Sequence, residues 1–444
     1  MESLNIEKIT SIGTNEYMTK RKTYAIVVIF VAAVVLISTI PSDRKATTTF
    51  PTENMHTYDH LSMSQHNHST HMSKNPLLDK KCPTEKSSSS VTIKTVSSML
   101  ESHTAVTDGG DARWNILAWL AKNDGGRVAA VDTYGLLQRF VLALLYSSMH
   151  GWDHNDGWQT GDTVCNWEGV GCGEDCATVN VLDLSMMKNL KGNIPEYIGY
   201  LTALTSLLMN SNSLSGNIPS KIGSLTALRE LSFWGNKLTG SIPSEIGSLT
   251  ALAELSLWGN KLAGSIPTEL SLLTSLTMLT VARNKLTGTI SNTIGSLTVL
   301  NTLDVCNNNL SGTIPADIGS LTALTQLFVF NNKLSGNIPS EVGSLTSLLD
   351  IYMYGNMLDG KIPSEIGPSS SIEVLFLSNN YLKGGIPSEL GMLMALRELY
   401  LDTNNLTGSI PEELKTIAKS LEFCNLGEHY GGNANLKGIP RNCG

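Results

Sequence analysis

The sequence predicts an α/β solenoid of ten regular repeats, each 24 residues long. The first observation is a strict grid of glycines at this period: Gly192, Gly216, Gly240, Gly264, Gly288, Gly312, Gly336, Gly360, Gly384 and Gly408. The second is the apolar pattern L-x-x-L-x-L-x-x-N, as in Leu228, Leu231, Phe233 and Asn236. Similarity at a fixed period of this length indicates one supersecondary unit stacked on copies of itself.

Each position of the repeat has a physical role. Apolar residues alternate for a few positions, which predicts one short strand per repeat with its leucines inward. Isoleucine and then proline follow the glycine in nine repeats of ten, with Ser291 as the exception. Because proline fixes φ and lacks an N–H, we expect an outer arc here and not a helix. Asparagine lies four residues before the glycine in nine repeats, and its carboxamide can bond backbone groups of two turns. We therefore expect a buried asparagine ladder.

The whole unit, as in Leu231 to Leu252 (LSFWGNKLTGSIPSEIGSLTAL), resembles the plant-type leucine-rich repeat. The resemblance covers roughly Cys165 to Cys443 and implies a right-handed solenoid with a parallel sheet on its concave side. At about 4.8 Å between strands, ten repeats give a sheet on the order of 45 to 50 Å long. Two repeats depart from the pattern. Lys188 replaces an asparagine near a one-residue insertion, and Pro368 and Ser369 interrupt the eighth repeat.

Both ends of the solenoid carry cysteines. The sequence CNWEGVGC from Cys165 to Cys172, preceded by GWDHNDGW, resembles the N-terminal cap of plant receptors of this type, in which the two cysteines are bonded. Apolar residues at helical spacing predict a helix over Asp132 to Met149, and a shorter one over about Ala112 to Lys122. At the other end we expect Cys424 and Cys443 to pair; buried reduced cysteines are the alternative for all four. Cys82, Cys176 and Cys306 are left unassigned, with Cys176 a competitor of Cys172 and Cys82 a possible link between chains.

The N-terminal part predicts a membrane anchor. Thr23 to Ile40 is an uncharged run of 18 residues that follows Lys20, Arg21 and Lys22. Such a run is just long enough for a bilayer core of about 30 Å, and the positive-inside rule places the repeats outside. A cleaved signal peptide is the alternative. The predicted order is a cytoplasmic tail (1–22), a signal anchor (23–40), a disordered stalk (41–110), a helical cap (111–180), repeats (181–420) and a C-terminal cap (421–444).

The chemistry of catalysis is missing from the repeats. The chain has 444 residues and a net charge of -8, so no basic domain for nucleic acid is present. From Asn155 to Glu428 there is no histidine, which excludes Ser-His and Cys-His pairs there. No kinase motif occurs, and we expect neither an enzyme nor a cofactor. Histidines and methionines between Met55 and Met72 suit a solvated stalk better than a soft metal site, because their spacing is irregular.

The outward positions of the predicted strands form the candidate binding surface. Large aromatics recur there, which predicts an exposed patch for a ligand; a ladder that only stabilises the sheet is the alternative. Acidic residues flank the aromatics and favour a ligand with basic groups, and the tryptophans also suit glycan stacking. The predicted contact residues are Trp234, Trp258, Phe328, Phe330, Tyr352, Tyr354, Phe376, Tyr400, Glu230, Glu254, Asp350 and Glu398.

A separate lateral column carries Lys237, Lys261, Lys285 and Lys333. Asn309 and Asn405, which open two of the three glycosylation sequons, share this column, and the third sequon begins at Asn67. Glycans at Asn309 and Asn405 would fence one side of the solenoid.

These observations favour a membrane-anchored, non-catalytic protein that binds an extracellular peptide, protein or glycan and signals through a co-receptor. It is similar to plant receptor-like proteins, and more weakly to the large leucine-rich repeat sets of diatoms and related algae. The alternative is a secreted or wall-associated enzyme inhibitor, similar to plant proteins that block pectin-degrading enzymes, or an adhesion protein.

Overall fold

The computed structural model describes residues 77–78, 81–82, 120, 133–150, 158, 162–187, 190–368, 371–427 and 433–443. All of them lie in one compact unit, Lys74–Gly444. The expected tail, the expected anchor 23–40, Asn67 and the histidine-rich tract lie outside the described residues, as does the shorter expected helix apart from the buried Leu120. In the described part of the chain, no helix is long and apolar enough to cross a membrane.

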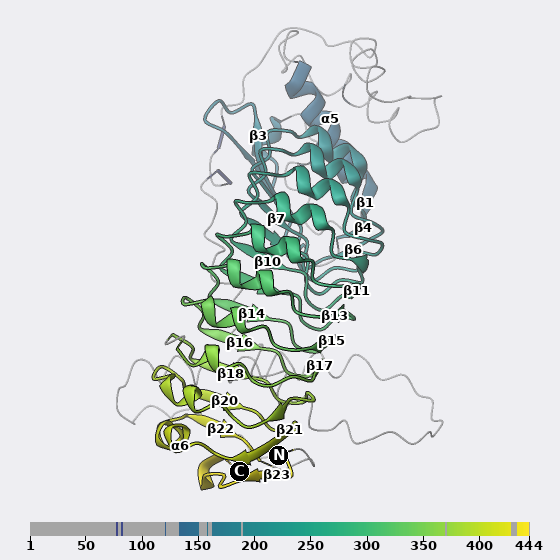
Figure 1. Cartoon of the computed structure of the whole chain (residues 1–444). Helices are drawn as coiled ribbons and strands as arrows, with labels where there is room; N and C mark the ends of the chain where they lie inside the picture. Colours follow the sequence, from purple (N-terminus) through teal and green to yellow (C-terminus); the bar gives the residue numbers. More distant parts are fainter. Residues whose placement is uncertain are drawn as a thin grey trace, which may run out of the picture. The chain divides into compact units, whose positions relative to one another are not determined.

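One main sheet of twelve strands runs along the solenoid, and every neighbouring pair is parallel except β2 and β3 (Figure 1). Successive strands pair in a register of 24 residues, so that Leu231 lies beside Leu255. This confirms the predicted repeat and its parallel sheet. The strands in spatial order are β2 Val170–Cys172, β3 Val179–Asp183, β5 Ser206–Leu208, β7 Glu230–Ser232, β8 Glu254–Ser256, β10 Met278–Thr280, β12 Thr302–Asp304, β14 Gln326–Phe328, β16 Asp350–Tyr352, β18 Val374–Phe376, β20 Glu398–Tyr400 and β22 Phe423–Asn425.

A second file of short strands, the lateral strands, follows the conserved asparagines and lies along another side of the solenoid (Figure 1). The grid glycines lie within these strands or just after them, and all but Gly360 have a positive φ. A Cβ at Gly312 would also lie 2.8 Å from Thr289 Cγ2 of the preceding coil, so this position excludes a side chain twice over. The lateral strands are β4 Lys191–Asn193, β6 Ser213–Ser215, β9 Ala263–Ser265, β11 Lys285–Thr287, β13 Ser311–Gly312, β15 Lys333–Gly336, β17 Met357–Leu358, β19 Lys383–Gly384, β21 Asn405–Ser409 and β23 Asn435–Lys437.

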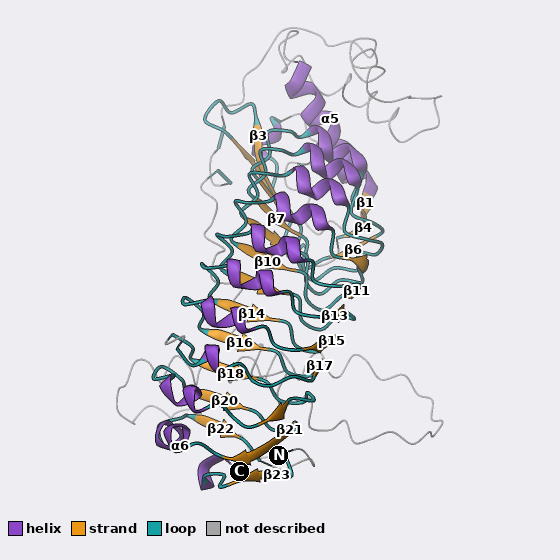
Figure 2. Ribbon diagram, in the orientation of Figure 1, coloured by secondary structure: helices purple, strands orange, loops and turns teal. Residues whose placement is uncertain are grey.

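The outer arc of the coils contains short 3-10 helices (Figure 2). The expectation that the Ile-Pro step gives an outer arc and not a helix is therefore wrong. Each 3-10 helix begins directly after the Ile-Pro step, because the proline lies at the extended N-cap position and leaves the next residues free to turn. Ser291 replaces this proline in one coil, and its hydroxyl accepts a hydrogen bond from the Thr293 N–H at 3.2 Å. The helices are η3 Glu196–Tyr200, η4 Ser220–Ser224, η5 Ser244–Ser248, η6 Thr268–Leu272, η7 Asn292–Ser296, η8 Ala316–Ser320, η9 Ser340–Ser344, η10 Ser364–Ile366 and η11 Ser388–Met392. The interruption at Pro368 shortens η10.

Leucines and isoleucines of all three sides fill one continuous core, and the asparagine ladder runs beside it. Asn332 is typical: its Oδ1 accepts from the Leu310 N–H at 3.0 Å, and its Nδ2 donates to the carbonyls of Val305 and Val329, both at 3.1 Å. These bonds confirm the predicted ladder. Asn433 continues it into the C-terminal cap by accepting from the Leu406 N–H, at an irregular spacing that the sequence analysis missed.

The ladder is incomplete at its first coil. The buried Asn212 Oδ1 makes no hydrogen bond, because the Leu190 N–H, which would serve it, bonds the Met187 carbonyl at 2.7 Å instead. The insertion near Lys188 therefore disturbs the backbone of this coil without opening the core.

The N-terminal cap combines a helix with two disulfides. α5 spans Thr133–Ser148, as predicted, and β1 Met149–His150 pairs antiparallel with β4. Cys165 of η2 Val164–Asn166 and Cys172 of β2 form the expected disulfide. Cys82 forms a second one with Cys176 of the same chain, and the Cys82 backbone exchanges two hydrogen bonds with the Asn166 side chain. Cys82 is thus a buried part of the cap.

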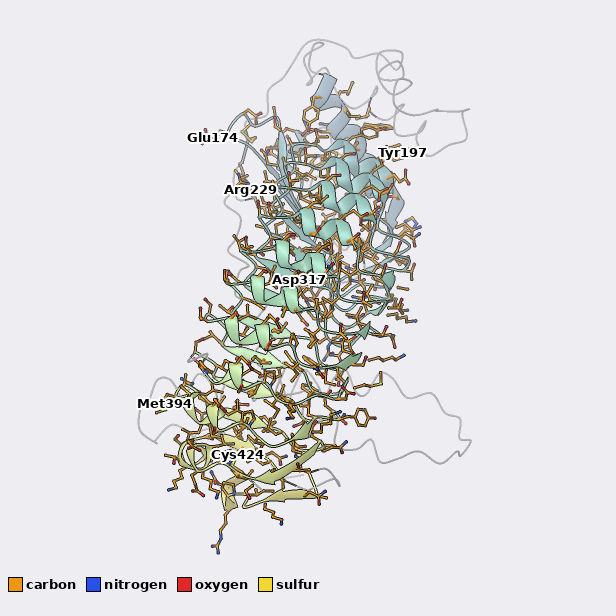
Figure 3. All side chains as sticks on the ribbon, in the orientation of Figure 1. Glu174, Tyr197, Arg229, Asp317, Met394 and Cys424 are labelled. Atoms are coloured by element: carbon orange, nitrogen blue, oxygen red, sulfur yellow. A yellow bond between two sulfur atoms is a disulfide. The ribbon has the colours of Figure 1, made fainter. Side chains whose placement is uncertain are left out.

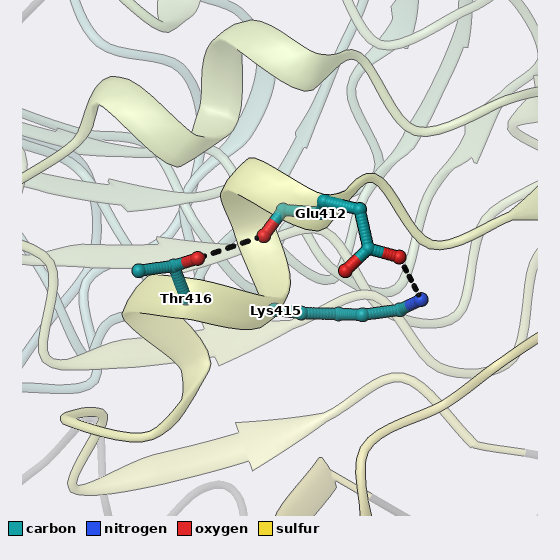
Figure 4. Close-up of polar contacts among 3 residues, drawn as sticks. All are labelled: Glu412, Lys415 and Thr416. Carbon is teal, nitrogen blue, oxygen red and sulfur yellow. Dashed lines mark hydrogen bonds and ion pairs between the residues drawn. The ribbon is translucent and has the colours of Figure 1, made fainter.

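The C-terminal cap replaces the last 3-10 helix by α6 Glu412–Ala418. Within it, Lys415 pairs with Glu412 at 2.7 Å, and the Thr416 hydroxyl donates to the Glu412 carbonyl (Figure 4). Cys424 of β22 and Cys443 of η12 Arg441–Cys443 form the expected disulfide, which closes the end of the core.

Candidate ligand-binding surface

The predicted contact residues lie on the outer face of the main sheet, the face turned away from the leucine core. The strand register brings them into columns: Phe328, Tyr352, Phe376 and Tyr400 occupy equivalent positions on neighbouring strands. The backbone therefore confirms that the predicted residues come together, because a register of one repeat stacks equivalent side chains.

Six of the aromatic side chains form one continuous stack, here called the aromatic ladder: Phe328, Phe330, Tyr352, Tyr354, Phe376 and Tyr400. Ring centroids of Phe376 and Tyr400 are 4.4 Å apart, and those of Phe330 and Tyr354 are 4.5 Å apart. Such offset and edge contacts stabilise a pair by about 0.5 to 1.5 kcal/mol beyond burial of area.

The expectation that these six side chains form an exposed patch is wrong. Their exposed fractions are only 2 to 6%. Each ring packs against a ring on at least one adjacent coil, which covers ring faces that the sequence analysis placed in solvent. The alternative prediction, a ladder that reinforces the sheet, describes these six residues better.

Trp234 and Trp258 form a separate pair. Each lies two residues after the end of a main-sheet strand, β7 and β8 respectively, on adjacent coils. Their rings are parallel within 5° and their centroids lie 4.9 Å apart. Unlike the aromatic ladder, both side chains are only half-buried. The following residues, Gly235 and Gly259, have positive φ and present no side chain beside the indoles. The tryptophan pair is therefore the aromatic part of this face that a ligand can reach.

The predicted carboxylates are half-buried and tied to their neighbours. The Ser206 hydroxyl donates to Glu230 Oε2 at 2.9 Å, and Gln326 Nε2 donates to Asp350 Oδ2 at 3.1 Å. Glu254 pairs with Glu230 in the register of β7 and β8, so the two carboxylates form an acidic edge. Each carboxylate lies four residues before the tryptophan of its own coil, about 13 Å away along an extended chain.

Farther along the sheet, Glu398 lies on the strand of Tyr400. Burial, and then the carboxylates of Asp350 and Glu398, raise the pKa of Tyr352 well above its ordinary value. Tyr352 therefore stays protonated at any physiological pH.

Two further acids on this face, Asp304 and Asp402, are 2 and 4% exposed. Asp304 accepts from the Thr280 hydroxyl and from the Cys306 N–H, and Asp402 accepts from the hydroxyls of Ser378 and Thr403. The sequence pattern places Asp402 among the acids that flank the aromatics, whereas Asp304 was not singled out.

Family models recognise the repeats of this chain. Residues 174–312 match the model described as a leucine-rich repeat region, and residues 371–393 and 395–417 match the leucine-rich repeat model. The repeat region is a leucine-rich repeat domain. No curated protein sequence matches the chain significantly.

Solved structures similar to the leucine-rich repeat domain include two from plant receptor studies. A TDR receptor is 33% identical with a TM-score of 0.51, and the match covers 52% of this chain and 40% of that one. PEPR1–AtPEP1 is 31% identical with a TM-score of 0.56, covering 65% of this chain and 44% of that one. The chain thus spans less than half the length of either receptor chain.

A plant ice-binding protein is also similar, with 26% identity and a TM-score of 0.57. That match covers 73% of this chain and 98% of the ice-binding protein.

In the described part of the leucine-rich repeat protein, no group of three or more His, Cys, Asp and Glu side chains is placed to hold a metal ion.

Proposed function

We propose that this protein recognises an extracellular peptide or protein through the outer face of its main sheet, with the tryptophan pair as the centre of the contact. The observation that carries the proposal is the half-buried, parallel Trp234–Trp258 stack, on the two coils that also carry Glu230 and Glu254. Tryptophan is among the residues that contribute most to binding free energy at interfaces. The similarity to a TDR receptor and to PEPR1–AtPEP1 supports a receptor-like role.

The chemistry of the face defines the ligand. Two parallel indoles form a flat apolar platform, and the carboxylates of Glu230 and Glu254, four residues before them on the same two coils, attract a cationic group. A peptide or protein loop with an apolar or aromatic residue next to Lys or Arg fits this combination. The aromatic ladder contributes differently: it stiffens the sheet on the C-terminal side of the platform and so limits the entropy lost when a ligand binds.

The proposal includes membrane attachment through Thr23 to Ile40, with residues 1–22 in the cytoplasm and the leucine-rich repeat domain outside. The uncharged run and the three preceding basic residues support it. The role needs no catalysis, and signalling would pass to a co-receptor. Carbonate extraction of membranes from expressing cells tests the anchor: the full-length chain should stay in the pellet, and a soluble chain that starts after residue 40 would contradict anchoring.

A screen of the full-length chain against secreted peptides and extracellular proteins tests recognition. The double variant Trp234→Ala/Trp258→Ala should lose the captured ligand, while Tyr381→Ala should keep it, because Tyr381 is an exposed aromatic on a lateral strand segment. Circular dichroism and thermal melting of both variants check that the fold is intact. Capture of glycans alone, or equal binding by both variants, would contradict the proposal.

Ice binding is a second candidate function, and a specific surface favours it in addition to the similarity to a plant ice-binding protein. After each 3-10 helix from η3 to η9 the chain presents an exposed threonine at the same position of successive coils, with no charged residue among them: Thr202, Thr226, Thr250, Thr274, Thr298, Thr322 and Thr346. A regular file of hydroxyls and methyls suits an ordered water surface. Thermal hysteresis of the full-length chain tests this; activity that Thr250→Lys/Thr298→Lys abolishes would support it, and an inactive chain would reject it.

A further inference from the structure

The lateral strands carry a charge opposite to that of the whole chain. In a protein with a net charge of -8, the described lateral segments contain one acidic residue, Asp359, and eight lysines. The lysines are Lys191, Lys237, Lys261, Lys285, Lys333, Lys361, Lys383 and Lys437. All eight side chains are exposed. We call this surface the lysine face. It follows the lateral strands, from β4 to β23, along one side of Figure 1.

Acidic residues gather on the other sides of the solenoid instead. The 3-10 helices of the outer arc carry an acid in the first turn in most coils, such as Glu245, Glu269, Asp317 and Glu341. Figure 3 labels Asp317 on the helical side. The outer face of the main sheet adds further carboxylates. The separation of charge by side means that the lysine face projects a local positive potential despite the negative total.

The lysines of the lysine face take part in no ion pair among the residues that the structure describes. The ion pairs there join Arg397 to Glu373 and Lys415 to Glu412. Lys237, Lys261 and Lys285 occupy the same position on three successive coils, about 4.8 Å apart along the stack. Like charges stacked at this distance repel one another, so the column is unfavourable for the free protein.

Two columns of small polar side chains lie beside the lysines. One contains hydroxyls such as Thr287, Ser311 and Ser335, which donate to the glycine carbonyls of the preceding coil at 3.3 to 3.4 Å. Their oxygens remain available as acceptors. The other column holds exposed amides and hydroxyls, including Asn217 and Asn337. The face therefore offers a line of cations with two columns of hydrogen-bonding groups next to it, both on the same side of that line.

From this arrangement we propose that the lysine face binds a linear acidic polysaccharide that runs parallel to the solenoid axis. One carboxylate or sulfate per sugar would meet the file of ammonium groups, and sugar hydroxyls would bond the flanking Ser, Thr and Asn side chains. Lys237, Lys261, Lys285 and Lys333 form one file, and such a file fits a chain better than a plane of charge. The other four lysines lie in the two neighbouring polar columns. A surface that binds an anionic membrane also inserts apolar groups into it. The lysine face has few exposed apolar side chains, such as Met357 and Tyr381 in two adjacent coils.

The test measures binding of the full-length chain, in non-ionic detergent, to immobilised dextran sulfate, alginate and uncharged dextran. All proteins carry Asn309→Gln, because Asn309 lies between Lys285 and Lys333 in the column and opens a sequon. We expect binding to dextran sulfate and alginate but not to dextran. The variant Lys237→Gln/Lys261→Gln/Lys285→Gln/Lys333→Gln should bind at least about tenfold more weakly, and the slope of log K against log salt should fall by about 3.

The matched control removes the same charge from other sides of the domain. Lys221→Gln/Arg229→Gln/Lys419→Gln/Arg441→Gln replaces four exposed basic residues, and it should keep the affinity within about twofold. Three results would overturn the proposal: no binding to either acidic polysaccharide, equal losses in both quadruple variants, or tighter binding of the lysine face to vesicles that contain phosphatidylserine. Because the tryptophan pair is intact in all these proteins, the outcome is independent of ligand recognition on the main sheet.

Discussion

At the scale of the residue, the most regular backbone feature is a left-handed position just before each buried asparagine. Glycine or asparagine occupies most of these positions, which suits a positive φ. The residues are Ser211, Gly235, Gly259, Arg283, Asn307, Asn331, Gly355, Asn379 and Thr403. Thr403 is the one β-branched residue among them, with φ at 53°. Its side chain opposes the conformation that the asparagine ladder requires.

Replacing this threonine tests that conflict. Thr403→Asn should stabilise the domain by about 1 kcal/mol, because asparagine tolerates the left-handed region better than a β-branched residue does. The hydrogen bond from the Thr403 hydroxyl to Asp402 would be lost, which offsets part of the gain. Urea unfolding measures the change in the free energy of unfolding. A lower unfolding midpoint for the variant would show that the hydrogen bond matters more than the backbone.

The asparagine ladder supplies a matched pair of variants. Asn332→Ala leaves the Leu310 N–H and two carbonyls without their partner, and we expect a loss of about 3 kcal/mol. Asn212→Ala should cost clearly less, because Asn212 Oδ1 already lacks a partner. Equal shifts of the unfolding midpoint in the two variants would contradict this assignment of the hydrogen bonds.

At the scale of the element, each coil combines a strand, a lateral strand and a 3-10 helix, and the three differ in how far sequence predicts them. The strands were predicted from the alternation of leucines, and the asparagine ladder from the column of asparagines that includes Asn332. The 3-10 helices were not predicted, because Pro243 and its equivalents look like helix breakers, although they lie at the N-cap. The aromatic ladder was misjudged as exposed, because exposure depends on how neighbouring coils pack, which periodicity does not specify.

The lateral strands depend on glycine. Gly312→Ala should destabilise the domain by about 2 kcal/mol or more, since alanine resists a positive φ and its Cβ would press on Thr289 Cγ2. Gly408→Ala has the same positive φ but no heavy atom within 4 Å of the added Cβ, so its loss should be smaller. Thermal melting compares the two. A greater effect at Gly408 would mean that the contact between coils is not the reason for the glycine grid.

At the scale of the whole molecule, the solenoid is closed at both ends by covalent bonds. Sequence indicated Cys165–Cys172 and Cys424–Cys443 through their resemblance to known caps. The third bond, Cys82–Cys176, joins residues 94 positions apart, and no local pattern identifies such a partner. Closing a loop of this length restricts the unfolded chain, which typically stabilises a protein by about 2 to 4 kcal/mol. The segment at Cys82 is therefore a fixed part of the cap.

This pattern leaves one thiol among seven cysteines. Burial, together with the Asp304 carboxylate, raises the pKa of the Cys306 thiol, so the native chain should not react with iodoacetamide at neutral pH. The chain unfolded in guanidinium without reductant should take up one label per molecule, on Cys306. Three labels per unfolded chain, with Cys82 and Cys176 modified, would contradict the third disulfide.

The central claim is that ligand recognition depends on the tryptophan pair. The most direct measurement is the ratio of dissociation constants for the captured ligand between Trp234→Ala/Trp258→Ala and Tyr381→Ala, obtained by calorimetry on full-length chains. Loss of two interface tryptophans typically costs about 2 kcal/mol or more each, so the ratio should exceed about 100. A ratio near 1, with both variants folded, would contradict the claim and move the binding site elsewhere on the solenoid.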